Sequence, residues 1–344
     1  MLIIGGMYIS LRYSGECARG IGNGIELCAG VLVPSLFLFM ALTAYAVQSG
    51  CAGVFASAFG WLARILKLPR EAAPAIVLAM IGGYPIGAGC CSLLFESGQL
   101  SESEARKTAY IAVAAGPGFV INYIGRSLLS DIRAGNILLA AQVAATLITG
   151  FIIGITVSCT PTKDRKRIVN YNAGALADAV NSAARATLRM CAIVILFSGL
   201  TEAATSITDE QTADILAAFL EVTTACSRIS ANAPLYVTAF IVGFGGLSVH
   251  FQVYANLTGI RINKALFTLF RLAQGIIAAA ITYIYLMIIP MEKDVFSTTQ
   301  AVPAPAASAT LFGSAALVLA SVCFIGSISG RLRRLDHVRD SRLA

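Results

Sequence analysis

Three polar side chains, Ser248, His250 and Gln252, stand at alternate positions within residues 229–260, a stretch with no charged side chain apart from the titratable His250. Ionisable side chains inside hydrophobic segments are rare and mark solute or ion paths by default. The sequence contains no Walker A run, zinc-metalloprotease helix signature or nucleophile elbow. No motif therefore indicates a hydrolase or an ATP-driven pump. We expect His250 to line a solute path. The alternative is a core histidine with its hydrogen bonds satisfied.

Two glycine-rich runs interrupt apolar segments, Gly-Gly-Tyr-Pro-Ile-Gly at 82–87 and Gly-Phe-Gly-Gly-Leu-Ser at 243–248. Glycine costs about 1 kcal/mol and proline about 3 kcal/mol in a helix interior, so each run should open its helix. The freed backbone groups must then meet protein, water or a ligand, and freed helix N-termini suit an anion. The alternative is a glycine-lined helix crossing. The predicted substrate-binding residues of these runs are Gly83, Tyr84, Pro85, Gly87, Gly245 and Gly246, with Ser248, His250 and Gln252 beside them.

Four further polar residues are candidates for the same site. Asn122 follows a Gly-Pro-Gly kink at 116–118, and a buried amide there would need hydrogen-bond partners. Glu221, Thr223 and Thr224 end a short apolar segment. They face either the site or the membrane interface, and both interpretations stay open.

The composition determines the setting of these residues. Hydrophobic residues make up 57% and charged residues 12% of the 344 positions, and the mean hydropathy is +0.77. Soluble domains carry roughly 25% charged residues. Residues 27–63, 134–162 and 295–330 contain no charge. A bilayer span needs about 20 apolar residues, so the sequence predicts an all-α polytopic membrane protein embedded in a lipid bilayer.

Charge and cysteine usage exclude other classes of protein. The net charge is +7, but the basic residues lie in short loops, such as residues 163–167, and in the C-terminal tail. This is the pattern of cytoplasmic loops and argues against a nucleic-acid partner. Nine cysteines without a C-x-x-C pair and only two histidines predict no metal site. We expect no enzyme activity and no cofactor.

The order of segments predicts two repeats. A shift of 161 positions places Gly82 on Gly243 and keeps five elements in the same order. Three crossings and one broken, re-entrant hairpin in each repeat would invert the second repeat, an arrangement typical of secondary transporters. The predicted parts are an N-terminal marginal helix and interfacial segment (1–26), a first repeat (27–158) with hairpin 72–95, a basic cytoplasmic linker and surface helix (159–187), a second repeat (188–328) with hairpin 232–258, and a basic tail (329–344).

The motifs resemble those of the sporulation integral membrane protein YlbJ family, of the nucleoside-recognition or Gate group. The resemblance spans residues 25–290 and rests on residues 82–88, on Gly116-Pro117 and above all on residues 244–253. It implies a fold similar to concentrative nucleoside transporters, with two re-entrant hairpins meeting near the membrane centre. It also implies a bacterial membrane location, at the membrane around the forespore, and passage of dipicolinate, a small planar dianion.

Three departures from that pattern leave the substrate open. Val-Ala-Ala at 113–115 replaces an expected Asn-Asn-Ser, Gln274 stands where a histidine would follow Arg271, and Leu38 replaces a proline. We expect a transporter or facilitator for a small anionic or heterocyclic solute. The alternatives are a nucleoside or nucleobase transporter coupled to Na⁺ or H⁺, and a non-transporting scaffold of the spore envelope. The coupling ion, Na⁺ or H⁺, and a homo-oligomeric state stay open.

Overall fold

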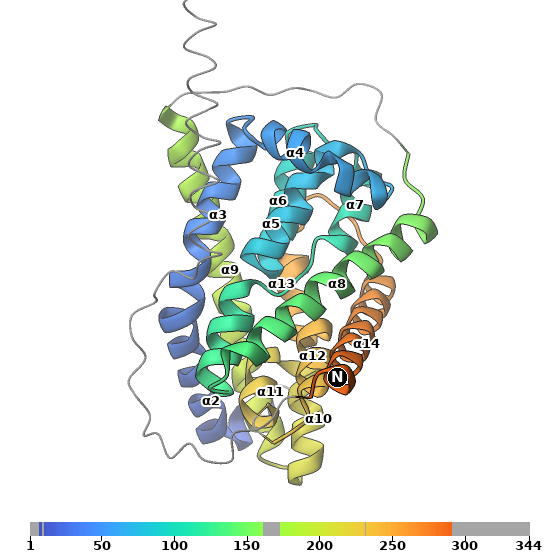
Figure 1. Ribbon diagram of the computed structural model, residues 1–344. Coiled ribbons are helices and arrows are strands. Elements are labelled where there is room, and N and C mark those ends of the chain that lie inside the picture. Colours follow the sequence, from blue (N-terminus) through green and yellow to red (C-terminus); the bar gives the residue numbers. More distant parts are fainter. Residues whose placement is uncertain (1–6, 9, 161–172, 231, 291–344) are drawn as a thin grey trace, which may run out of the picture. The chain divides into compact units, whose positions relative to one another are not determined.

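In the computed structural model, every regular element among the described residues is helical (Figure 1). The structure describes residues 7–8, 10–160, 173–230 and 232–290. Residues 161–172 of the predicted basic linker, residues 291–328 of the predicted second repeat, the basic tail and most of the first ten residues lie outside these described residues.

The elements follow one another without strands in the described residues. In the first half they are α2 (Ser14–Leu27), the π-helical η1 (Cys28–Leu32), α3 (Val33–Gln48), α4 (Ala52–Ile65), the 3₁₀ turn η2 (Arg70–Ala72), α5 (Ala73–Gly82), α6 (Tyr84–Glu96), α7 (Glu102–Ile111), the π-helical η3 (Gly118–Leu128) and α8 (Ile132–Thr156). In the second half they are α9 (Ala173–Thr205), α10 (Glu210–Leu220), α11 (Val222–Ile229), α12 (Leu235–Phe244), α13 (Gly246–Asn256) and α14 (Lys264–Ile288).

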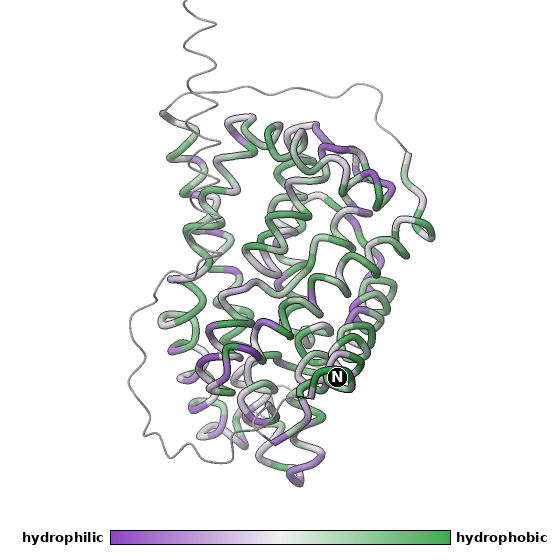
Figure 2. The backbone as a smooth tube through the Cα atoms, viewed as in Figure 1, coloured by the Kyte–Doolittle hydropathy of each residue, from purple (hydrophilic) through white to green (hydrophobic). Residues whose placement is uncertain are grey.

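Within the described residues, five helical stretches are long and apolar enough to cross a membrane. They are Ser14–Gln48, Ile132–Thr156, Gly174–Thr205, Leu235–Asn256 and Lys264–Ile288. Figure 2 shows hydrophobic residues along these helices and hydrophilic residues gathered towards their ends. The predicted all-α membrane architecture is confirmed.

Two helices extend past the boundaries predicted from the sequence. The helix that contains α2, η1 and α3 runs from Ser14 to Gln48, so the N-terminal segment does not end at residue 26. In the same way, α9 runs through residue 187 without a separate surface helix. These long helices pack on each other: α2 and α3 both lie along α9, and Arg19 of α2 approaches Glu202 of α9 at 3.9 Å.

Glycines allow α2 and α9 to approach closely. Gly20 and Gly24 are four residues apart and therefore lie on the same face of α2. A methyl group on Gly20 would lie 2.9 Å from Cα of Gly199, and one on Gly24 would lie 3.0 Å from Cα of Ile195. Small residues at this spacing are a common solution for helix contacts in membranes.

The first predicted break occurs at Gly83, whose φ of 103° lies in the left-handed region. This residue ends α5 and precedes α6, and the two helices pack against each other. Pro85 lies in the first turn of α6, where a missing N–H is tolerated. The glycine run therefore opens the segment where the sequence predicted.

The second predicted break is confirmed, but the hairpin predicted for residues 232–258 is not observed. Gly245 and Gly246 have φ values of 83° and 67° and separate α12 from α13. The two helices do not fold back on each other, and together they form one interrupted span, Leu235–Asn256. The reason is packing: α12 contacts α8 and α14, whereas α13 contacts α6 and α9.

A further break, which the sequence did not predict, separates α10 from α11 at Glu221. Asp209 begins this helix pair by accepting hydrogen bonds from the backbone N–H (3.0 Å) and the hydroxyl (2.7 Å) of Thr212. These bonds lower the pKa of Asp209. Glu221 has an extended backbone, with φ −145° and ψ 116°, and α10 and α11 pack against each other around it.

Replacing Gly24 by leucine should destabilise the protein, because the new side chain would enter the α2–α9 contact at Ile195. Overpacking of this kind costs about 1–3 kcal/mol, which corresponds to a melting temperature lowered by roughly 2–4 °C per kcal/mol. Gly22→Leu is the matched control, because no atom lies within 4 Å of the added Cβ there. The measurement is the apparent melting temperature of both variants in one detergent, and equal values would contradict the close packing.

Candidate functional site

The turn between α5 and α6 packs against a second irregular segment, between α7 and η3. A methyl group on Gly116 would lie 3.1 Å from the backbone N of Gly83 and 3.1 Å from the carbonyl carbon of Gly82. Only glycine fits this approach without displacement. The packed turn α5–α6 therefore contacts the interruption that follows α7.

The turn between α10 and α11 makes the same kind of contact with the interruption between α12 and α13. A methyl group on Gly246 would lie 3.2 Å from the backbone N of Glu221 and 3.2 Å from the carbonyl carbon of Leu220. Each of the two helix pairs thus directs its turn against an interrupted helix.

Glu221 is a buried carboxylate at the second of these contacts, with 1% of its surface exposed. One of its oxygens, Oε2, accepts hydrogen bonds from the backbone N–H (2.7 Å) and the hydroxyl (3.0 Å) of Thr224. The other oxygen, Oε1, accepts one from the hydroxyl of Ser248 at 3.4 Å. The structure thus brings together three predicted site residues, Glu221, Thr224 and Ser248. No ion pair to Glu221 is formed within the described part of the chain.

Arg271 of α14 links the two interruptions. Its Nη1 donates to the carbonyl of Val113 at 2.8 Å, after α7, and its Nε donates to the carbonyl of Phe244 at 3.3 Å, at the end of α12. Its guanidinium also lies 5.6 Å from the ring centre of Tyr84. The side chain is 1% exposed, it has no ion-pair partner among the described residues, and its Nη2 has no hydrogen-bond partner there.

Other buried polar side chains near Arg271 form hydrogen bonds with it or with backbone carbonyls of α12. Gln274 accepts from Arg271 at 2.7 Å and donates to the hydroxyl of Thr146 at 2.7 Å. The hydroxyl of Tyr84 donates to the carbonyl of Val242 at 2.6 Å and so joins the start of α6 to α12. Gln142 of α8 donates to the carbonyl of Ala239 of α12 at 2.8 Å. The buried polar side chains therefore converge on the interrupted helices.

His250 is fully buried within an aromatic cluster, with its ring centre 5.1 Å from those of Phe244 and Phe267. Its Nδ1 lies 2.6 Å from the carbonyl of Gly246. A carbonyl only accepts, so Nδ1 carries the hydrogen and a neutral ring has its Nε2 free to accept. Nε2 has no partner among the described residues. His250 lies directly behind the second interruption, and the solute-path interpretation stays a prediction.

The other predicted residues occupy different places. Gly87 is buried where α6 passes Ala112, because an added methyl group there would collide with the carbonyl of Ala112. Gln252 is buried on α13, and Asn122 is half-buried on η3. Pro85 and Thr223 line pockets.

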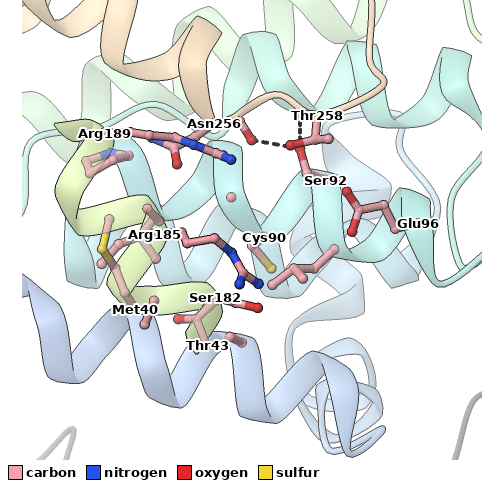
Figure 3. Close-up of a pocket in the computed structure, with 17 residues that line it drawn as sticks. Met40, Thr43, Cys90, Ser92, Glu96, Ser182, Arg185, Arg189, Asn256 and Thr258 are labelled. Atoms are coloured by element: carbon pink, nitrogen blue, oxygen red, sulfur yellow. Dashed lines mark hydrogen bonds between the residues drawn. The ribbon is translucent and has the colours of Figure 1, made fainter. Parts of the chain in front are cut away.

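Two pockets run beside the helix pairs. The first, of about 230 Å³, lies between α3, α6 and α9 and extends along α6 from Pro85 to Glu96 (Figure 3). The second, of about 180 Å³, lies between α2, η3, α9 and α11 and is lined from Thr223 to Arg228 of α11. Each pocket therefore begins two residues after the turn of a helix pair, at Gly83 or at Glu221.

Sequence reasoning missed the arginines of this region as site residues. Arg271 lies eight residues into the apolar helix α14, and Arg185 and Arg189 lie in α9 and line the first pocket. An arginine inside a membrane-length apolar helix was the signal that could have identified them. Arg185 was instead assigned to a surface helix, because α9 was divided at residue 187.

Comparison with curated proteins identifies a distant homologue. The sporulation integral membrane protein YlbJ of Bacillus subtilis (strain 168) is 22% identical over 312 residues, which cover 75% of this chain and 74% of that protein. The resemblance predicted from the glycine motifs is thus confirmed, and the chain is an integral membrane protein homologous to a Bacillus sporulation membrane protein. No family model matches the chain, and no solved structure matches it.

Arg271→Lys should destabilise the protein although it keeps the positive charge. A single ammonium group cannot reproduce the fork that reaches both Val113 and Phe244. Loss of one hydrogen bond in this buried setting costs about 1–3 kcal/mol. We expect Arg271→Lys to lower the apparent melting temperature in detergent. Arg126→Lys, at an exposed position of η3, should leave it unchanged. Unchanged melting of Arg271→Lys would contradict the role of the fork.

Proposed function

We propose that the protein is a transporter or facilitator that moves a small anionic or heterocyclic solute across a bacterial membrane during sporulation. Its homologue, a sporulation integral membrane protein, supports the sporulation setting. The observation that carries the transport proposal is the meeting of two interrupted helices at the buried guanidinium of Arg271.

The physical reason is the behaviour of backbone in hydrocarbon. Non-helical backbone at membrane depth is tolerated only where it is buried in protein or lines a cavity. Interrupted helices at corresponding places in two halves are the usual binding sites of secondary transporters. Here two packed helix turns, at Gly83 and Glu221, contact two interruptions, at Gly116 and Gly246. We infer an internal correspondence of α5–α6 with α10–α11, in place of the shift of 161 positions.

The two pockets support a solute path that can open separately at each of its two ends. One pocket follows α6 and the other follows α11, and each starts beside a helix turn. Re-entry of the two helix pairs from opposite sides of the membrane would place one opening on each side. Movement of the helix pairs against the interrupted helices would then open one pocket at a time.

The electrostatics favour an anion over a cation. Arg271 has no ion-pair partner among the described residues and keeps Nη2 without a hydrogen bond, whereas the buried carboxylate of Glu221 has its oxygens occupied by Thr224 and Ser248. The N-termini of α6 and α13 lie at the two breaks and add positive potential there. Dipicolinate, the solute implied by the motif resemblance, is a dianion that suits these charges.

Uptake by proteoliposomes that contain the purified full chain tests the proposal. We expect dipicolinate uptake above that of empty liposomes, and a loss of at least tenfold with His250→Ala and with His250→Gln, which keeps a polar group. Ser57→Ala, on an exposed face of α4, is the control for handling.

The other outcomes separate the alternatives. Uptake of uridine alone, driven by a Na⁺ or H⁺ gradient, would assign the nucleoside alternative. Absence of flux for both solutes, with the folded protein confirmed by its melting temperature, would contradict transport and favour a scaffold.

A further inference from the structure

Two arginines of α9 have exposed side chains and no acidic partner among the described residues. Arg185 and Arg189 are one helical turn apart, about 18 Å and 24 Å from the start of a helix that is about 50 Å long. Neither forms an ion pair among the described residues. Within the part of the chain that the structure describes, their one hydrogen bond runs from Nη1 of Arg189 to the carbonyl of Ala255, at 3.5 Å.

Both side chains line the first pocket. Figure 3 shows them extending from α9 across the pocket towards α6 and the end of α13. Glu96 is the one carboxylate among the pocket-lining residues. Two guanidinium groups thus face one carboxylate, and the pocket carries an excess of positive charge.

We propose that this pocket is a capture site for a compact organic anion, held by Arg185 and Arg189 before it reaches the interrupted helices. The proposal rests on the transport function inferred above, because the pocket ends at Pro85, beside the α5–α6 turn. A guanidinium binds a carboxylate through two parallel hydrogen bonds, so two arginines suit a solute with two acidic groups.

The pocket also limits the size and shape of the solute. Its volume of about 230 Å³ equals that of about eight water molecules, enough for a single substituted ring. Met40 and Ile86 form an apolar wall against which such a ring can lie. The hydroxyl of Ser92 is already used, because it donates to the carbonyl of Asn256 (2.8 Å) and accepts from the N–H of Thr258 (2.8 Å). The arginines are the charged donors that line the pocket.

A lipid phosphate presents the same acidic oxygens as a dissolved carboxylate. Arginines in membrane helices often extend to the headgroup region and attract anionic lipids there. Both arginines line a pocket enclosed by α3, α6 and α9, which favours a dissolved solute, and the experiment must separate the two sources.

Equilibrium binding to the full chain in nanodiscs of neutral phosphatidylcholine tests the capture site. The probes are dipicolinate, its monoanionic analogue picolinate, and the uncharged diamide of dipicolinate. We expect dipicolinate to bind most tightly and the diamide not to bind. Arg185→Gln and Arg189→Gln should each weaken binding roughly tenfold to hundredfold, as expected for loss of a charged hydrogen bond. The double variant should abolish binding.

Controls separate a binding defect from a folding defect. Arg126→Gln removes an exposed arginine of η3 and should leave binding unchanged. Arg185→Lys should retain part of the affinity. All variants must keep the melting temperature of the unchanged chain, and any that does not is replaced by the lysine variant at that position.

The outcomes distinguish this proposal from the transport proposal. Unchanged affinity in the folded double variant would overturn the capture site, as would variants that alter only the binding of phosphatidylglycerol added to the nanodiscs. Binding that depends on both arginines without any flux would uphold the site and contradict transport. Undiminished flux in the double variant would uphold transport and overturn the capture site.

Discussion

The need to satisfy backbone groups inside a membrane explains most of this structure. An interrupted helix exposes carbonyls that continuous helix would have used, and each unsatisfied group costs several kcal/mol in hydrocarbon. Arg271 donates hydrogen bonds to the freed carbonyls at both interruptions, those of Val113 and Phe244. Its own burial is possible because those carbonyls, Gln274 and the Tyr84 ring replace water around the guanidinium. The interruptions and the buried arginine therefore stabilise each other.

The two helix turns reach the interruptions by different local chemistry. At the first, glycine stands on both sides of the contact, at Gly83 and Gly116, so backbone packs directly on backbone. At the second, Gly246 alone provides the space, and the turn is made by Glu221 in an extended conformation that any residue can adopt. Its carboxylate then caps α11 through Thr224, a bond that glycine could not make. The second turn thus adds a negative charge that the first lacks.

This difference explains what the sequence could predict. Gly83 and Gly245 require left-handed backbone, so the glycine runs marked both breaks correctly, and the uncharged stretches predicted an all-α membrane protein. The turn at Glu221 contains neither glycine nor proline and could not be recognised. Whether a broken segment folds back is decided by its partners: α12 packs mainly on α8 and α14 and α13 mainly on α6 and α9, so residues 232–258 form an interrupted span. The convergence of Arg271 on both breaks depends on tertiary structure.

The arginines of the protein divide into two physical roles. Arg271 donates hydrogen bonds to Val113, Phe244 and Gln274, so this residue holds the fold together and supplies a fixed positive potential. Arg185 and Arg189 make little use of their donors and face an open pocket, so their hydrogen bonds remain free for a solute. An anion held by Arg185 and Arg189 would then be attracted by the positive charge of Arg271. In the proposed transport, Arg185 and Arg189 would bind and release the anion, while Arg271, which donates to Val113, Phe244 and Gln274, keeps the interrupted helices in place.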